Sequence, residues 1–84
     1  MFEKIIPLLQ QITEDRRVPR NIKKRISECI DELKNESHSV ALRVNTVTSI
    51  LDEVSNDPNM PMYTRTQIWN IVSALEAIGA QNSK

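Results

Sequence analysis

The side chains whose spacing could support chemistry lie in two charged segments of this 84-residue sequence. Six of the eleven basic residues fall within ten positions, at Arg16, Arg17, Arg20, Lys23, Lys24 and Arg25. Three acidic residues follow much later, at Asp52, Glu53 and Asp57. The basic segment could bind an anion or phosphate, because clustered guanidinium and ammonium groups near a helix N-terminus attract such ligands. If the two segments meet, the same charges could instead form inter-helix ion pairs, and we favour this interpretation.

Polar groups around Asp57 form a second candidate site. A small enzyme could use Asp57 and the neighbouring amides of Asn56 and Asn59 as polar catalytic groups. The same three residues, together with Asn21, are also candidates for an interface or anion site. The sequence has no Gly-rich phosphate loop, H-E-x-x-H, Cys-His pair or G-x-S-x-G motif. A calcium loop starting at Asp57 is also rejected, because Ile68 stands where the bidentate Glu is required. We therefore expect no enzyme activity, catalytic residue, metal, cofactor or small-molecule substrate.

Trp69 shares a helix flank with Met62 and Arg65. One interpretation is that Trp69 packs at the core edge beneath the loop at 56–60. The other is that it anchors a second subunit or a protein partner, since aromatic, Met and Arg side chains are enriched at interfaces. The core of an 84-residue chain contributes only a few kcal/mol of net folding stability, and a homo-oligomer would add buried surface.

The elements that position these groups are helices. The sequence has one Gly and no period-2 alternation, so we expect an all-α protein with a single domain over residues 1–84. Short connections favour an up-down-up-down antiparallel four-helix bundle. Apolar spacing predicts helices over residues 2–14, 19–34, 39–55 and 61–78, with a frayed tail over 80–84.

Local signals set the helix boundaries. Proline suits a helix start and disfavours helix in the residue before it, so Pro19 and Pro61 should begin the second and fourth helices. Thr64 with Gln67 resembles a capping box and offers a later start for the fourth. The third helix has either Ser37 or Ser39 as its N-cap.

Two further residues affect helix geometry. Gly79 is placed to stop the fourth helix in a left-handed conformation. Pro7 lies near the start of the first helix, where it could produce a kink.

Three single residues have specific expectations. Arg43 falls in an apolar sector, so it is a candidate buried ion that needs an anionic partner, with Glu76 or Glu32 the choices from antiparallel geometry. His38 should be a solvated loop residue, since no second His or Cys lies near it. Cys29 should pack as a small hydrophobe, which suits a reducing cytoplasm.

The net charge of the chain is zero, which argues against partners that are recruited by a strong overall charge. Eleven basic residues balance eleven acidic ones, so no global field recruits nucleic acid or an anionic membrane. No stretch is long enough to span a bilayer, and no signal peptide is visible. In an antiparallel bundle, Val18–Lys24 and Asn56–Trp69 lie at one end. We expect protein contacts there, including self-association, and the alternative is a nucleic-acid or ribosome-associated binder that uses the basic segment.

Three motifs resemble uncharacterised protein family zero-one-four-seven, a group of small archaeal proteins. They are V-P-R-N-I at 18–22, S-I-L-D-E-V-S-N-D-P-N-M-P at 49–61 and R-T-Q-I-W-N-I-V-S-A-L-E at 65–76. The resemblance implies an archaeal, cytosolic protein and a small helical bundle. It supplies no established activity, so no catalytic residue is carried over.

Overall fold

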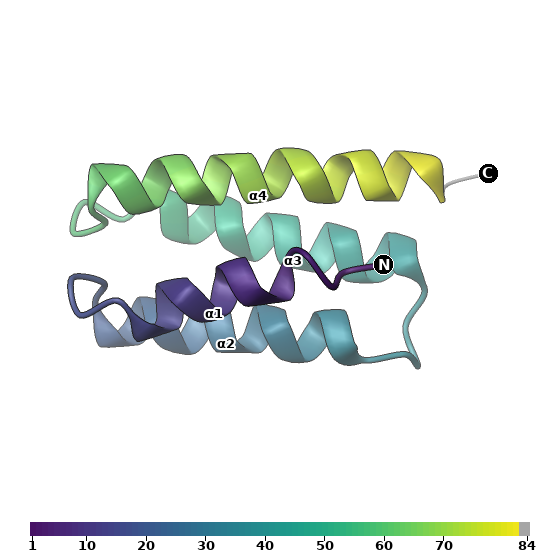
Figure 1. Cartoon of the computed structure of the whole chain (residues 1–84), viewed down its shortest axis with the longest axis horizontal. Helices are drawn as coiled ribbons and strands as arrows, with labels where there is room; N and C mark the ends of the chain where they lie inside the picture. Colours follow the sequence, from purple (N-terminus) through teal and green to yellow (C-terminus); the bar gives the residue numbers. More distant parts are fainter. Residues whose placement is uncertain (83–84) are drawn as a thin grey trace.

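The computed structural model describes residues 1–82, and within that range it contains four α-helices and no strand. The helices are α1 (Ile6–Glu14), α2 (Arg20–Lys34), α3 (Val40–Ser55) and α4 (Met62–Gln81). The all-α class predicted from the sequence is confirmed. The α1–α2 and α3–α4 connections lie at one end of the molecule and the α2–α3 connection at the other (Figure 1). None of the helices in the described range is both long and apolar enough to cross a bilayer.

One continuous core joins the helices. α1 packs on α2, α2 on α3 and α3 on α4, whereas α1 and α4 make no comparably extensive contact among the described residues. Leu9, Ile26, Leu51 and Leu75 are each completely buried, one from each helix. Burying such a side chain contributes about 1.5 to 3 kcal/mol, so the stripes predicted from apolar spacing supply the main stabilisation.

Proline and serine begin the helices as expected, to within one residue. Pro19 and Pro61 are the N-cap residues of α2 and α4, with backbone angles outside the helical region. Ser39 caps α3, because its side-chain oxygen accepts the backbone N–H of Leu42 at 3.1 Å. Ser37 is therefore not the cap. Thr64 lies buried inside α4 and does not start it.

The first helix is shorter than the predicted range of 2–14. It begins at Ile6, and residues 3–5 form a turn in which the Phe2 carbonyl accepts the N–H groups of Ile5 and Ile6. Pro7 consequently lies in the first turn of α1, where a missing N–H breaks no helical hydrogen bond. A kink inside the helix is therefore not required.

Gly79 does not stop α4, contrary to the sequence prediction. The helix continues to Gln81 with Asn82 as its C-cap, and no described residue has a positive φ. A Cβ atom added to Gly79 would lie 3.2 Å from Cγ1 of Val44. The glycine therefore serves close packing between α3 and α4. The predicted frayed tail is wrong for residues 80 and 81, which are helical, and residues 83–84 lie outside the described range.

Candidate functional site

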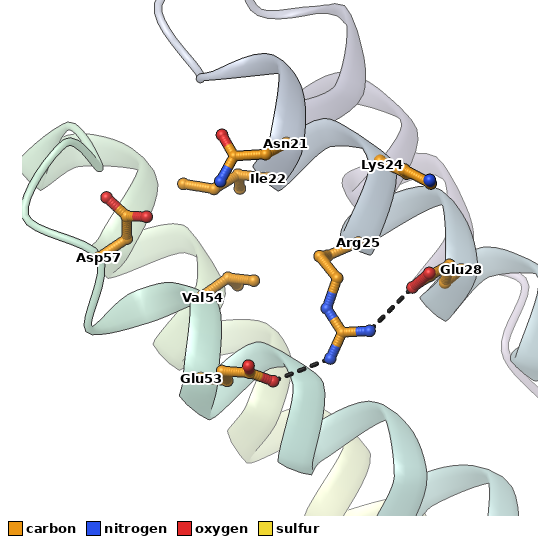
Figure 2. Close-up of a pocket in the computed structure, with 8 residues that line it drawn as sticks. All are labelled: Asn21, Ile22, Lys24, Arg25, Glu28, Glu53, Val54 and Asp57. Atoms are coloured by element: carbon orange, nitrogen blue, oxygen red, sulfur yellow. Dashed lines mark hydrogen bonds and ion pairs between the residues drawn. The ribbon is translucent and has the colours of Figure 1, made fainter.

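The two charged segments meet at one end of the molecule, as predicted. A groove of about 400 Å³ separates the start of α2 from the end of α3 (Figure 2). Its lining residues are Asn21, Ile22, Lys24, Arg25, Glu28, Glu53, Val54 and Asp57. The α1–α2 loop also reaches α4, because the Arg17 guanidinium lies 5.9 Å from the centre of the Tyr63 ring. The ends of all four helices therefore lie at this end of the molecule.

Arg25 makes an ion pair between α2 and α3. Its Nη2 donates to Oε2 of Glu53 at 2.8 Å, and its Nη1 donates to Oε2 of Glu28 at 2.9 Å (Figure 2). The hydrogen bond to Glu53, followed by that to Glu28, raises the pKa of the Arg25 guanidinium above its ordinary value. The pair lies at the surface, so its contribution to stability is small.

The rest of the expected ion-pair network is absent within residues 1–82. Among the described residues, no carboxylate lies within 4.0 Å of the charged groups of Arg16, Arg20, Lys23 or Lys24, and no basic group lies that close to the carboxylate of Asp52 or Asp57. Asp52 immediately precedes Glu53 and lies about 100° from it around the helix, so it points away when Glu53 faces α2. The basic segment therefore keeps most of its charge unpaired within the described part of the chain.

Arg17 finds its carboxylate in its own loop. Its Nη2 lies 2.9 Å from Oδ2 of Asp15, and its backbone N–H donates to Oδ1 of the same residue at 2.9 Å. The side-chain hydrogen bond from Arg17, with the backbone one second, lowers the pKa of Asp15 to about 2. This contact holds in place the Arg17 guanidinium that lies 5.9 Å from the centre of the Tyr63 ring.

Asp57 and its neighbouring asparagines hold the α3–α4 turn. Oδ1 of Asp57 accepts the backbone N–H of Asn59 at 2.8 Å, and the Asp57 carbonyl accepts Nη2 of Arg65 at 3.1 Å. The Nδ2 of Asn56 donates to the Asp52 carbonyl at 3.0 Å. Asn21 lines the same groove on the α2 side (Figure 2). Asn56 and Asp57 are therefore engaged in ending α3 and shaping the turn that leads to α4.

Trp69 is not covered by the loop at 56–60. Its side chain is 52% exposed and that of Met62 is 67% exposed, while Met60 is buried beneath the turn instead. Met62 and Trp69 are seven positions apart, about two helical turns, and so share a flank of α4 that we call the Trp69 flank. Arg65 lies between them and is half-buried.

Sequence reasoning did not single out Tyr63, which is 63% exposed. It lies six positions before Trp69, which places it about 120° around the helix and on a different flank. The signal that could have found it was an aromatic residue outside the apolar stripe at the start of the helix. Its contact with Arg17 is not visible from local spacing.

Arg43 has a different partner from the one predicted. Its Nη1 donates to the Leu33 carbonyl at 3.0 Å, its guanidinium lies 5.4 Å from the centre of the Phe2 ring, and its Nε is buried without a partner. Neither Glu76 nor Glu32 pairs with it among the described residues. A carbonyl at the end of α2 and an aromatic face replace the expected carboxylate.

Glu32 instead pairs with His38. The Nδ1 of His38 lies 2.6 Å from Oε2 of Glu32. His38 is a partly exposed loop residue, in line with the sequence prediction, but it has a carboxylate partner that the sequence did not indicate. Cys29 is buried, and desolvation raises the pKa of its thiol to about 12. The sequence prediction that Cys29 packs as a hydrophobe is consistent with both findings.

The fold and site define a small all-helical protein with a basic end and an exposed aromatic flank, and such a fold specifies no activity by itself. The profile of the Uncharacterised protein family (UPF0147) matches residues 1–78. The chain belongs to this family, which confirms the resemblance carried by the three motifs. The family description assigns no function.

Relatives and solved structures agree with the family assignment. The UPF0147 protein of Metallosphaera sedula is 50% identical over 77 residues, covering 92% of this chain and 86% of that protein. That of Methanosarcina mazei is 46% identical over 78 residues, covering 93% and 84%. The crystal structure of a protein from uncharacterized family UPF0147 from Thermoplasma acidophilum matches with a TM-score of 0.86 at 41% identity, covering 90% of this chain and 89% of that one. The crystal structure of unknown function protein MMP1188 matches with a TM-score of 0.85 at 45% identity, covering 89% and 85%. These relatives are mostly archaeal.

Proposed function

We propose that this protein is a non-enzymatic interaction module that associates with a second copy of itself through the Trp69 flank. The observation that carries the proposal is the exposure of Trp69, at 52%, beside Met62 at 67%. Large aromatic side chains near the centre of a protein interface dominate binding energy, and Met is enriched there as well. The Trp69 flank therefore has the composition of an interface.

Helix topology provides a rigid base for this flank. Consecutive helices pack together, and their connections alternate between the two ends of the molecule (Figure 1). This arrangement supports an up-down-up-down antiparallel bundle, in which α3 braces α4 along its length. Rigid helices hold exposed side chains with little loss of freedom on association, which favours binding.

Energetics favour the aromatic flank over the charges as the source of association. A Trp side chain presents up to about 250 Å². Trp69 is 52% exposed, so burying this exposed part in an interface removes about 130 Å² from water and contributes about 3 kcal/mol. A two-fold symmetric dimer buries the same residue from both copies. A surface ion pair such as Arg25–Glu53 contributes less than about 1 kcal/mol.

A non-catalytic role in the cytoplasm is part of the same proposal. In the groove, the carboxylates of Glu28, Glu53 and Asp57 each already accept a hydrogen bond from the protein. These hydrogen bonds give each carboxylate a structural role, which supports the non-catalytic proposal. The lone buried thiol of Cys29 suits a reducing compartment.

Light scattering over a concentration series tests the proposal. We expect the wild-type mass to rise above 9.7 kDa as concentration increases through the micromolar range. Trp69→Ala should shift the association to far higher concentration while retaining helicity. Tyr63→Ala is the matched control, because it removes an equally exposed aromatic from another flank of α4. A wild-type monomer at every concentration, or equal effects of the two variants, would refute the proposal.

A further inference from the structure

We propose that the basic end of the molecule binds single-stranded RNA, using a surface that we call the basic face. It comprises Arg16, Arg17, Arg20, Lys23, Lys24 and Tyr63. This inference does not depend on self-association, because it uses a different flank of α4 from Trp69. It rests on unpaired charge, on the chemistry of a helix N-terminus and on an exposed aromatic ring.

Unpaired charge is the first observation. Within the described part of the chain, Arg16, Arg20, Lys23 and Lys24 have no carboxylate within 4.0 Å. Arg20, Lys23 and Lys24 stand at positions i, i+3 and i+4 of α2, so their side chains are neighbours on the helix surface. Sequential phosphates of an RNA strand are the ligand that such a row of cations fits.

In the described part of the chain, no acidic residue of α3 forms an ion pair with this row. Glu53 is held by Arg25, which lies on the α3 side of α2 (Figure 2). Arg20 is five positions before Arg25, which places it about 140° around the helix from the Arg25–Glu53 pair. Lys24 lines the groove that also contains Glu28, Glu53 and Asp57, but its ammonium group has no carboxylate within 4.0 Å among the described residues. Arg20 and Lys24 therefore both remain available to an external anion.

The cations of the basic face lie at the N-terminus of α2, where positive charge is unfavourable unless an anion is bound. A helix N-terminus carries partial positive charge and favours anions, yet the first turn of α2 contains no acidic residue. Its N-cap, Pro19, provides no side-chain acceptor for the first backbone N–H groups. The cations repel one another, and the positive end of the helix dipole repels each of them. A bound phosphate reduces both repulsions.

The exposed ring of Tyr63 indicates that the ligand has unpaired bases as well as phosphates. The residue is 63% exposed, and the centre of its ring lies 5.9 Å from the Arg17 guanidinium, which Asp15 holds in place. Exposed rings beside a cationic track stack on the bases of single strands, whereas a duplex keeps its bases stacked on one another. The basic face therefore combines backbone neutralisation with one stacking platform.

Fluorescence anisotropy with a labelled oligouridylate of about 12 nucleotides tests the charge contribution on the full chain. With three phosphate contacts, the slope of log affinity against log salt is about −2, so binding should weaken about 20-fold between about 50 and about 200 mM salt. Arg20→Gln/Lys24→Gln should weaken binding at least tenfold at the lower salt and flatten this slope. Lys4→Gln/Lys34→Gln removes the same charge from exposed sites outside the basic face and should change affinity less than about twofold.

Variants of the aromatic residues test the stacking contribution. Tyr63→Ala should weaken oligouridylate binding about fivefold or more, while Trp69→Ala should leave it unchanged. Absence of binding at low salt, or equal losses in the two double variants, would overturn the proposal. Duplex RNA that binds as tightly as the single strand, with no effect of Tyr63→Ala, would overturn the assignment to single strands. Retained circular dichroism spectra establish that each variant is folded.

Discussion

Replacing Arg43 by Met tests the unexpected environment of this side chain. The substitution keeps the apolar stem but removes the hydrogen bond from Nη1 to the Leu33 carbonyl and the contact with the Phe2 ring. A charged hydrogen bond contributes about 1.5 to 3 kcal/mol and a cation–π contact about 0.5 to 2 kcal/mol. The variant also removes the buried, unpartnered Nε, which costs about 1 to 3 kcal/mol. The net prediction is that the free energy of unfolding falls by about 1 to 2 kcal/mol.

Urea unfolding followed by circular dichroism measures this change. Glu76→Gln is the matched control, because Glu76 was the carboxylate expected from sequence but makes no ion pair with Arg43 among the described residues. It should change stability by less than about 0.5 kcal/mol. A loss near 3 kcal/mol or more in Glu76→Gln would indicate a buried salt bridge and refute the geometry. An Arg43→Met variant as stable as wild type would refute the energetic reasoning.

Three other residues give separate predictions. Because its contact with Arg17 lowers the pKa of Asp15 to about 2 from an ordinary value of 3.8, Asp15 stabilises the fold above about pH 5 and loses this effect as pH falls toward about 2. The stability difference between wild type and Asp15→Asn, measured by urea unfolding, should therefore shrink over that range, and a constant difference would contradict the pairing. Cys29, with a thiol pKa of about 12, should react with a thiol reagent at about pH 8 only after unfolding. Rapid labelling of the native protein would contradict its burial. Gly79→Ala should destabilise by about 1 kcal/mol, because crowding against Val44 outweighs the gain in helix propensity. In a Val44→Ala background the same substitution should become stabilising in thermal unfolding, and an unchanged sign would refute the crowding.

Local chemistry accounts for the boundaries that sequence predicted well. Pro19, Pro61 and Ser39 each restrict or cap the backbone within their own turn, so their effect needs no knowledge of the rest of the chain. The apolar stripes were predictable for a similar reason, since helical spacing alone decides which face is buried. These signals were sufficient to predict four helices and most of the core.

Contacts between distant elements account for the errors. Gly79 carries a common stop signal, but its small size is used against Val44 on the neighbouring helix. Arg43 lies beside a carbonyl and a ring, two partners that no charge pattern reveals. Both depend on how far each helix is rotated and shifted along its neighbour.

The candidate site shows the same division. That the segments of Arg20 and Asp57 share one end follows from helix order, and the sequence predicted it. Which of Asp52, Glu53 and Asp57 pairs with the basic segment depends on helix rotation, and in the described part of the chain it is Glu53, through Arg25. The exposure of Trp69 likewise depends on how the α3–α4 loop packs. Met60 is the residue of this loop that is buried in the core, while Trp69 remains half exposed.

Intrinsic fluorescence of Trp69 tests the proposed interface most directly, because the chain contains one tryptophan. The ring is half exposed in the single chain, so dilute protein should emit at a long wavelength typical of contact with water. If the Trp69 flank is the contact surface, raising the concentration should move the emission maximum to shorter wavelength, in parallel with the rise in mass. An emission maximum that stays constant while the mass rises would place the contact elsewhere and contradict the account.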